Sequence, residues 1–88
     1  MAHHVEIEPQ VLKELRNLPL ADERRVVEKI RGLAEEPRPI GCEKMVGQRD
    51  AWRIRSGNYR VVYRVDDSEQ VVTVTRVGHR REVYRRTR

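Results

Sequence analysis

Basic residues and residues able to move protons gather in two stretches of the sequence, 50–65 and 77–86. The first stretch reads DAWRIRSGNYRVVYRV and the second reads VGHRREVYRR. Together they hold seven candidates for chemistry on a phosphate group: Arg53, Arg55, Arg60, His79, Arg80, Arg81 and Tyr84. A guanidinium group can donate two parallel hydrogen bonds to one phosphate, so arginine is well suited to hold a polyanion.

Cleavage of RNA by its own 2′-hydroxyl group makes three demands on such residues. The hydroxyl must lose a proton, the phosphorane must have its negative charge stabilised, and the 5′-oxygen must gain a proton. Arginine suits the second task, but its pKa above about 12 makes it a poor base or acid at neutral pH. Tyr84 among guanidinium groups would have a lowered pKa and could act as a base or orient the hydroxyl. His79 has an ordinary pKa of about 6.5, which suits either proton transfer.

The same residues also have plainer structural interpretations. Arg53 and Arg55 could form a solvated strand face, and Tyr84 could be an apolar anchor for the C-terminal segment. Three other aromatic residues are expected to pack in the core: Trp52, Tyr59 and Tyr63. From the residues alone we expect a basic, RNA-binding domain in which Tyr84 is a candidate catalytic residue.

The alternation of apolar residues with arginine predicts the elements that position this site. Residues 52–55 and 59–65 read as two strands of a hairpin, and Ser56-Gly57-Asn58 supplies the tight turn between them. Residues 70–77 are rich in β-branched side chains and predict a further strand. The hairpin should therefore present apolar side chains on one face and arginines on the other.

The N-terminal half predicts a short strand over 3–8 and two helices over 9–18 and 20–34. Apolar residues recur at helical spacing in both helices: Val11, Leu12, Leu15 and Leu18, then Val26, Val27, Ile30, Leu33 and Ala34. The predicted order is β-α-α-β-β-β in one α+β domain of 88 residues. The helical hairpin packs on one face of a small antiparallel sheet, and the arginines occupy the other face.

Positive charge is concentrated in the predicted sheet. Residues 49–88 hold 11 basic and 5 acidic residues, whereas residues 1–48 hold 8 and 9. Arginine outnumbers lysine by 16 to 3. Codon bias explains a preference for arginine but not its segregation, so we expect a nucleic acid or an acidic protein as partner.

Several function classes find no support in the sequence. It contains no Walker-type phosphate loop, no G-x-S-x-G motif and no zinc-ligand spacing. His3 and His4 are adjacent on a strand and face opposite ways, so we expect no metal site and no cofactor. The single Cys42 excludes a disulfide framework and fits a reducing compartment. No apolar run approaches the roughly 20 residues of a membrane span, and no signal peptide is evident, so we expect a cytoplasmic protein.

The two stretches resemble the RelE branch of the RelE/ParE superfamily of bacterial and archaeal type II toxins. The matching motifs are W-R-I-R-x-G-x-Y-R-V-V-Y-R-V and V-x-V-x-x-V-G-H-R-R-E-V-Y. The preceding strand and helical hairpin also match in order and length, so the resemblance covers nearly the whole chain. It implies a RelE-like fold of the microbial ribonuclease type and a ribosome-dependent endoribonuclease. Such an enzyme cuts mRNA in the ribosomal A site without a metal, by 2′-hydroxyl attack that leaves a 2′,3′-cyclic phosphate and a 5′-hydroxyl.

The resemblance also implies roles for single residues. Arg53 and Arg55 fall where the family has basic residues that bind and activate the substrate. Arg60 matches the arginine credited with stabilising the transition state. Arg80 matches the arginine proposed to protonate the leaving group, and Tyr84 matches the tyrosine that stacks on or orients the nucleotide. The remaining predicted RNA-binding residues are Arg64, His79, Arg81 and Arg85.

One departure bears on the mechanism. The positions of Arg53 and Arg55 are often lysine in the family, and lysine shifts its pKa far more readily than arginine. The task of accepting the 2′-hydroxyl proton therefore moves to Tyr84 or His79.

The resemblance implies three partners: a cognate antitoxin, the 70S ribosome and mRNA. The antitoxin should carry an acidic, amphipathic segment that wraps the basic face in a toxin–antitoxin hetero-oligomer. Two alternatives share the fold. One is a ParE-like inhibitor of DNA gyrase, and the other is a non-catalytic RNA- or protein-binding module.

Overall fold

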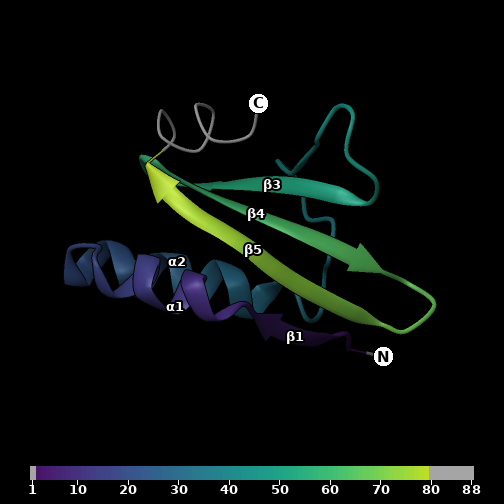
Figure 1. Cartoon of the computed structure of the whole chain (residues 1–88), viewed down its shortest axis with the longest axis horizontal. Helices are drawn as coiled ribbons and strands as arrows, with labels where there is room; N and C mark the ends of the chain where they lie inside the picture. The colour runs from purple at the N-terminus through teal and green to yellow at the C-terminus, as the bar shows by residue number, and fades with distance from the viewer. Residues whose placement is uncertain (1, 80–88) are drawn as a thin grey trace.

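The computed structural model describes residues 2–79, in which two helices lie against one face of a five-stranded sheet (Figure 1). The elements are β1 (His4–Ile7), α1 (Pro9–Arg16), α2 (Leu20–Gly32), β2 (Glu43–Lys44), β3 (Ala51–Ser56), β4 (Tyr59–Asp66) and β5 (Val71–His79). The predicted α+β class and the helical layer on one side of the sheet are confirmed. No helix in this part of the chain is long and apolar enough to cross a membrane.

The sheet has the strand order β1-β5-β4-β3-β2 and is mixed. β3, β4 and β5 form the predicted antiparallel meander, whereas β1 pairs with β5 in parallel, with His4 opposite Val71. The all-antiparallel sheet of the prediction needs this refinement, because local patterning does not report the direction of a pairing between distant segments. The prediction also lacked β2, whose two residues are too few to show a period of two.

The core lies between the helices and the sheet. Val11 and Leu15 of α1, with Val26 and Ile30 of α2, pack against the inner face of the three long strands. The buried strand residues of this core are Ile54, Val61, Tyr63, Val65, Val72, Val74 and Val77. Leu12, predicted on the same helical stripe, is 43% exposed because it lies at the stripe's edge.

Two local features shape β5 beside the site. The register shifts at Val62 and Tyr63, so that β5 carries one extra residue, Thr75, whose hydroxyl donates to the Val62 carbonyl at 3.2 Å. Such bulges bend a strand and increase its twist. Further along, the Val77 N–H donates to the Glu14 carboxylate at 2.8 Å, so α1 provides the acceptor beyond the end of β1. The predicted tight turn is confirmed: Ser56 pairs with Tyr59, and Gly57 takes a φ of +59°.

Candidate nucleic-acid interface

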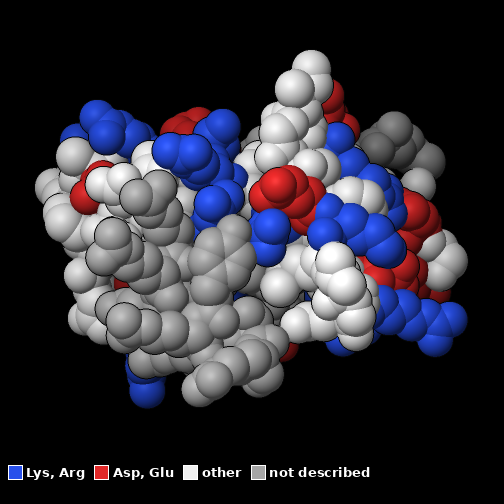
Figure 2. Space-filling model, turned by 90° about the horizontal axis from the view of Figure 1, so that it is seen from above, with Lys and Arg blue, Asp and Glu red and all other residues white. Residues whose placement is uncertain are grey.

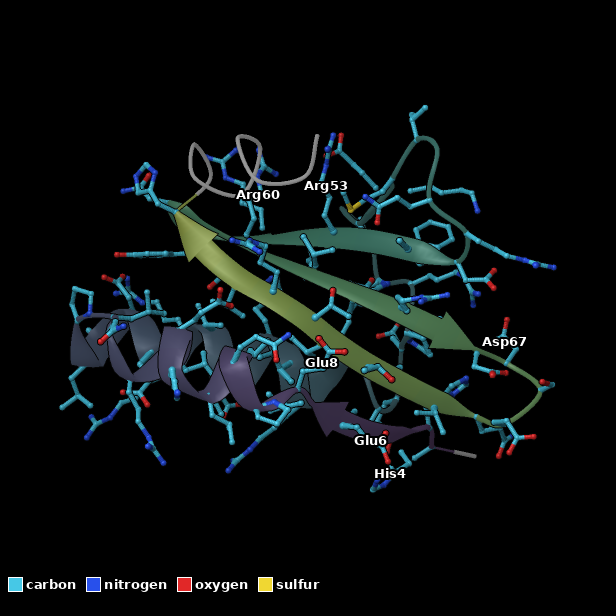
Figure 3. The ribbon with its side chains drawn as sticks, viewed as in Figure 1. His4, Glu6, Glu8, Arg53, Arg60 and Asp67 are labelled. Atoms are coloured by element: carbon cyan, nitrogen blue, oxygen red, sulfur yellow. The ribbon has the colours of Figure 1, made fainter. Side chains whose placement is uncertain are left out.

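The sheet face turned away from the helices carries the arginines of the hairpin. Trp52 and Ile54 face the core, so the alternating Arg53 and Arg55 face outward. Arg55 is the cross-strand partner of Arg60, which puts those two residues on the same face. Figure 3 shows Arg53 and Arg60 on the same side of the sheet. The predicted apolar-in, arginine-out hairpin is thus confirmed.

Glu43 links two of these arginines. Its register partner across β2 and β3 is Arg53, and the Arg53 Nε donates to Glu43 Oε1 at 2.9 Å. The same carboxylate oxygen lies 4.0 Å from Nη1 of Arg60. The hydrogen bond from Arg53 holds the pKa of Glu43 below its usual range, so the carboxylate stays ionised at neutral pH. We call Arg53, Arg55 and Arg60 with Glu43 the arginine cluster.

The side chains of the arginine cluster differ in how far they are exposed to solvent. The side chains of Arg53 and Arg60 are 24% and 15% exposed, whereas Glu43 is 56% exposed. Arg55 is exposed, and its Nε donates to the Gly57 carbonyl at 3.2 Å. Two arginines directly opposite each other repel, and a bound anion relieves that repulsion. Viewed from the β3 side, basic side chains gather over the sheet with acidic ones among them (Figure 2).

Arg64, predicted to bind RNA, lies at the other end of the same face. It pairs with Ala51 and Thr73, about 13 Å along β4 from Arg60 at the usual rise of a strand. There it lines a hollow of about 250 Å³ together with three carboxylates, those of Glu8, Asp50 and Asp66. The structure therefore does not bring Arg64 into the arginine cluster, and its surroundings are acidic.

His79 is also separated from the arginine cluster. Its register partner is Tyr59, whose ring packs against the core on the helix side of the sheet. The two rings meet edge to face, with centroids 5.9 Å apart. The preceding residue, Gly78, is the partner of Arg60, so β5 ends beside the arginine cluster. The predicted site residues Arg80, Arg81, Tyr84 and Arg85 lie outside the described residues.

Aromatic residues of the hairpin hold the loop that precedes β2. The Tyr63 hydroxyl donates to the Pro37 carbonyl at 2.7 Å, and burial raises its pKa well above the usual value. Trp52 has the guanidinium of Arg38 5.1 Å from its ring centre and the Lys44 Nζ at 5.4 Å. The packing roles predicted for Trp52 and Tyr63 are confirmed.

Arg38 also ties this loop to the turn between β4 and β5. Its Nη2 donates to Asp67 at 2.9 Å, and the ring of His3 lies 3.3 Å from the same carboxylate. These contacts, the bond from Arg38 foremost, lower the pKa of Asp67. Within residues 2–79 no three His, Cys, Asp or Glu side chains are grouped as metal ligands.

Sequence reasoning missed Glu43, which lies at the centre of the arginine cluster. Its strand is two residues long and follows a loop with positive φ at Gly41, so no periodicity marks it. The one available signal is that Glu43 is an acidic residue shortly before a strongly basic hairpin.

Comparisons with known proteins agree with the fold and the motifs. The family model for the ParE toxin of the type II toxin–antitoxin system parDE matches residues 5–84. The mRNA interferase toxin RelE of Escherichia coli K12 is 38% identical over 88 residues, covering 96% of this chain and 92% of that protein. Toxin RelG of Mycobacterium tuberculosis is 33% identical over 87 residues, covering 98% and 100%.

Solved structures give the same result. The archaeal RelE–RelB complex from Pyrococcus horikoshii OT3 contains a chain with a TM-score of 0.81 and 35% identity, covering 91% of this chain and 97% of that one. The intact E. coli RelBE toxin–antitoxin complex gives 0.76 and 34%, covering 89% and 96%. The chain therefore belongs to the RelE/ParE superfamily of type II toxins.

Proposed function

We propose that the protein is the toxin of a type II toxin–antitoxin system and a ribosome-dependent endoribonuclease that cleaves mRNA in the A site. The observation that carries this proposal is the arginine cluster on the face of the sheet that the helices leave uncovered. Relatives at up to 38% identity over nearly the whole chain bear the name mRNA interferase. The location that follows is the cytoplasm, where translating ribosomes are found.

The proposed reaction is attack of the 2′-hydroxyl on the adjacent phosphate. Arg53 and Arg55 hold the phosphate, and Arg60 neutralises the charge that develops on the phosphorane. Arg60 suits this task because its side chain is largely buried in the cluster, which limits the reorganisation needed as charge builds up. The reaction breaks the bond to the 5′-oxygen and leaves a 2′,3′-cyclic phosphate and a 5′-hydroxyl.

Proton transfer is assigned to the segment after β5. His79 faces the helix side of the sheet, which favours Tyr84 over His79 for orienting or deprotonating the 2′-hydroxyl. Arg80 is the proposed donor to the leaving 5′-oxygen. RNA contacts beyond the cluster are assigned to Arg81 and Arg85, and Arg64 would contribute least because three carboxylates share its hollow.

The proposed inhibitor is a cognate antitoxin with an acidic, amphipathic segment that covers the basic face. RelE relatives of known structure are found in complexes with RelB antitoxins. An acidic segment would neutralise the arginines that RNA needs, so antitoxin and RNA should compete for this face.

A second candidate function is ParE-like inhibition of DNA gyrase, which the name of the matching family model favours. The two relatives that are 38% identical to this chain are named as mRNA interferases, and on that ground we rank the nuclease first. The two functions predict different targets for the same purified protein.

The deciding experiment adds purified protein to translating ribosomes on a defined mRNA and maps cuts by primer extension. Tyr84→Phe and Arg60→Ala run beside the wild type, with Arg24→Ala on α2 as a charge-matched control on the opposite side of the sheet. The proposal is supported if cuts in the A site weaken in Tyr84→Phe and Arg60→Ala but not in Arg24→Ala. If the wild type makes no cuts but inhibits supercoiling by gyrase, the ParE-like function replaces it.

A further inference from the structure

Glu43 places an anionic oxygen beside two guanidinium groups of the arginine cluster. Its Oε1 accepts a hydrogen bond from Arg53 at 2.9 Å and lies 4.0 Å from Arg60. One anionic oxygen between two guanidinium groups reproduces the way arginines hold a phosphate. A phosphate bound by Arg53 and Arg60 together must therefore displace this carboxylate.

The backbone of Glu43 is held by strand pairing, whereas its side chain is held by a hydrogen bond from Arg53 and is exposed. β2 pairs with β3 in register, and two residues later Met45 is buried with Ala51 and Val62 on the same face as the arginines. The Met45 N–H also donates to the Ala51 carbonyl at 2.9 Å. The Glu43 side chain is 56% exposed, so it can rotate into solvent without breaking the strand pairing.

We propose that Glu43 is a built-in competitor of RNA at the phosphate site, which sets how much RNA binding energy is needed to open the arginine cluster. The inference rests on the function proposed above and deepens it. An isolated single strand that makes few contacts is disfavoured, whereas a substrate held in place by other contacts delivers its phosphate and turns the carboxylate out. Glu43 thereby favours RNA that other contacts hold in place over RNA that is free in solution.

Counterion release gives the expected size of the effect. An arginine that is already paired with a carboxylate causes a smaller net release of salt ions when a phosphate binds to it. Removing the carboxylate should therefore make the plot of log affinity against log salt concentration steeper by about 0.7 for a single strand. An exposed ion pair of this kind suggests a gain in RNA affinity of about two- to fivefold at low salt.

The test compares Glu43→Gln with Glu35→Gln, which makes the same change in net charge in the turn after α2. The probe is a single-stranded oligoribonucleotide with 2′-O-methyl groups, which cannot be cleaved, and binding is followed by fluorescence anisotropy over a range of salt. Glu43→Gln should bind more tightly and with the steeper salt dependence, and Glu35→Gln should match the wild type. Thermal unfolding of each variant shows whether the fold is kept.

A double-mutant cycle separates competition from a general change in charge or stability. In an Arg53→Gln background, Glu43→Gln should give a smaller gain, because the pairing has already been removed. Equal gains in both backgrounds, or equal affinity of Glu43→Gln and wild type, overturn the proposal. So does unchanged affinity with lost cleavage, which would place Glu43 in proton transfer instead. The ribosome assay tests the nuclease activity independently. Cleavage can fail while Glu43→Gln still tightens RNA binding, and cleavage can succeed while Glu43→Gln leaves RNA binding unchanged.

Discussion

Replacing Arg60 by alanine should reduce cleavage much more than it reduces binding. The arginine is the cross-strand partner of Arg55 and is 15% exposed, so its guanidinium group is held before any substrate arrives. A preorganised donor to a developing anion typically contributes about 10²- to 10³-fold to kcat. Single-turnover cleavage by Arg60→Ala on programmed ribosomes should therefore fall by about two orders of magnitude or more.

The loss in binding should be far smaller. A non-specific affinity of about 10⁻⁵ M, spread over about seven phosphate contacts, gives roughly 1 kcal/mol per contact. Arg60→Ala should thus weaken binding to ribosomes or to an uncleavable oligonucleotide about fivefold. Arg24→Ala, which removes the same charge from α2, should change neither quantity by more than about twofold.

The assay measures the two quantities on the same preparations. Cleavage is followed at saturating protein, and binding is followed in parallel with an uncleavable mRNA. Arg60→Lys adds a useful intermediate, since it keeps the charge and loses the planar fork of donors. Equal losses of cleavage and binding in Arg60→Ala would refute the reasoning and make Arg60 an ordinary binding residue.

Three further outcomes follow from the structure. Tyr63→Phe removes the donor to the Pro37 carbonyl, which lies in a partly buried hydrogen bond, so it should cost about 0.5–1.5 kcal/mol of stability and lower the Tm by a few degrees in a thermal melt. An unchanged Tm contradicts the assigned bond. Asp67 has a lowered pKa, so its contribution to stability is present above about pH 4 and is lost as the pH falls further. Asp67→Asn should therefore make stability depend less on pH in that range. An unchanged dependence of stability on pH argues against the contact with Arg38. RNA binding by the wild type should fall steeply between low and physiological salt, and a flat salt dependence would remove arginine–phosphate pairing from the explanation.

The sequence predicts the fold well because its local signals agree. The alternation around Trp52 and Ile54, the glycine turn at Gly57 and the apolar stripes of both helices each identify an element and its buried face. The parallel pairing of β1 with β5 was out of reach, because it joins segments separated by most of the chain. The short β2 was missed because two residues are too few to show a pattern.

The site was predicted in part. Arg53, Arg55 and Arg60 are adjacent in the hairpin register, and the turn alone is enough to align them. Glu43 joins them only through a pairing at the edge of the sheet, and Arg64 lines a hollow together with acidic residues that come from three different segments. His79 lies on the helix side of the sheet because β5 carries an extra residue opposite Val62, and the sequence does not mark that bulge.

The pairing of β1 with β5 also constrains the time at which the molecule can form during its synthesis. His4 leaves the ribosome early, but its partner Val71 is added only after the helices and the hairpin have been made. Until then β1 has no partner strand among the described elements, and the Glu14 carboxylate cannot yet accept its hydrogen bond from the Val77 N–H. Long-range pairings of this kind are slow to close, because the intervening loop must lose entropy first. The arginines of the hairpin therefore lie in an incomplete sheet until β5 is made, and the folded domain can form only after β5 has been synthesised.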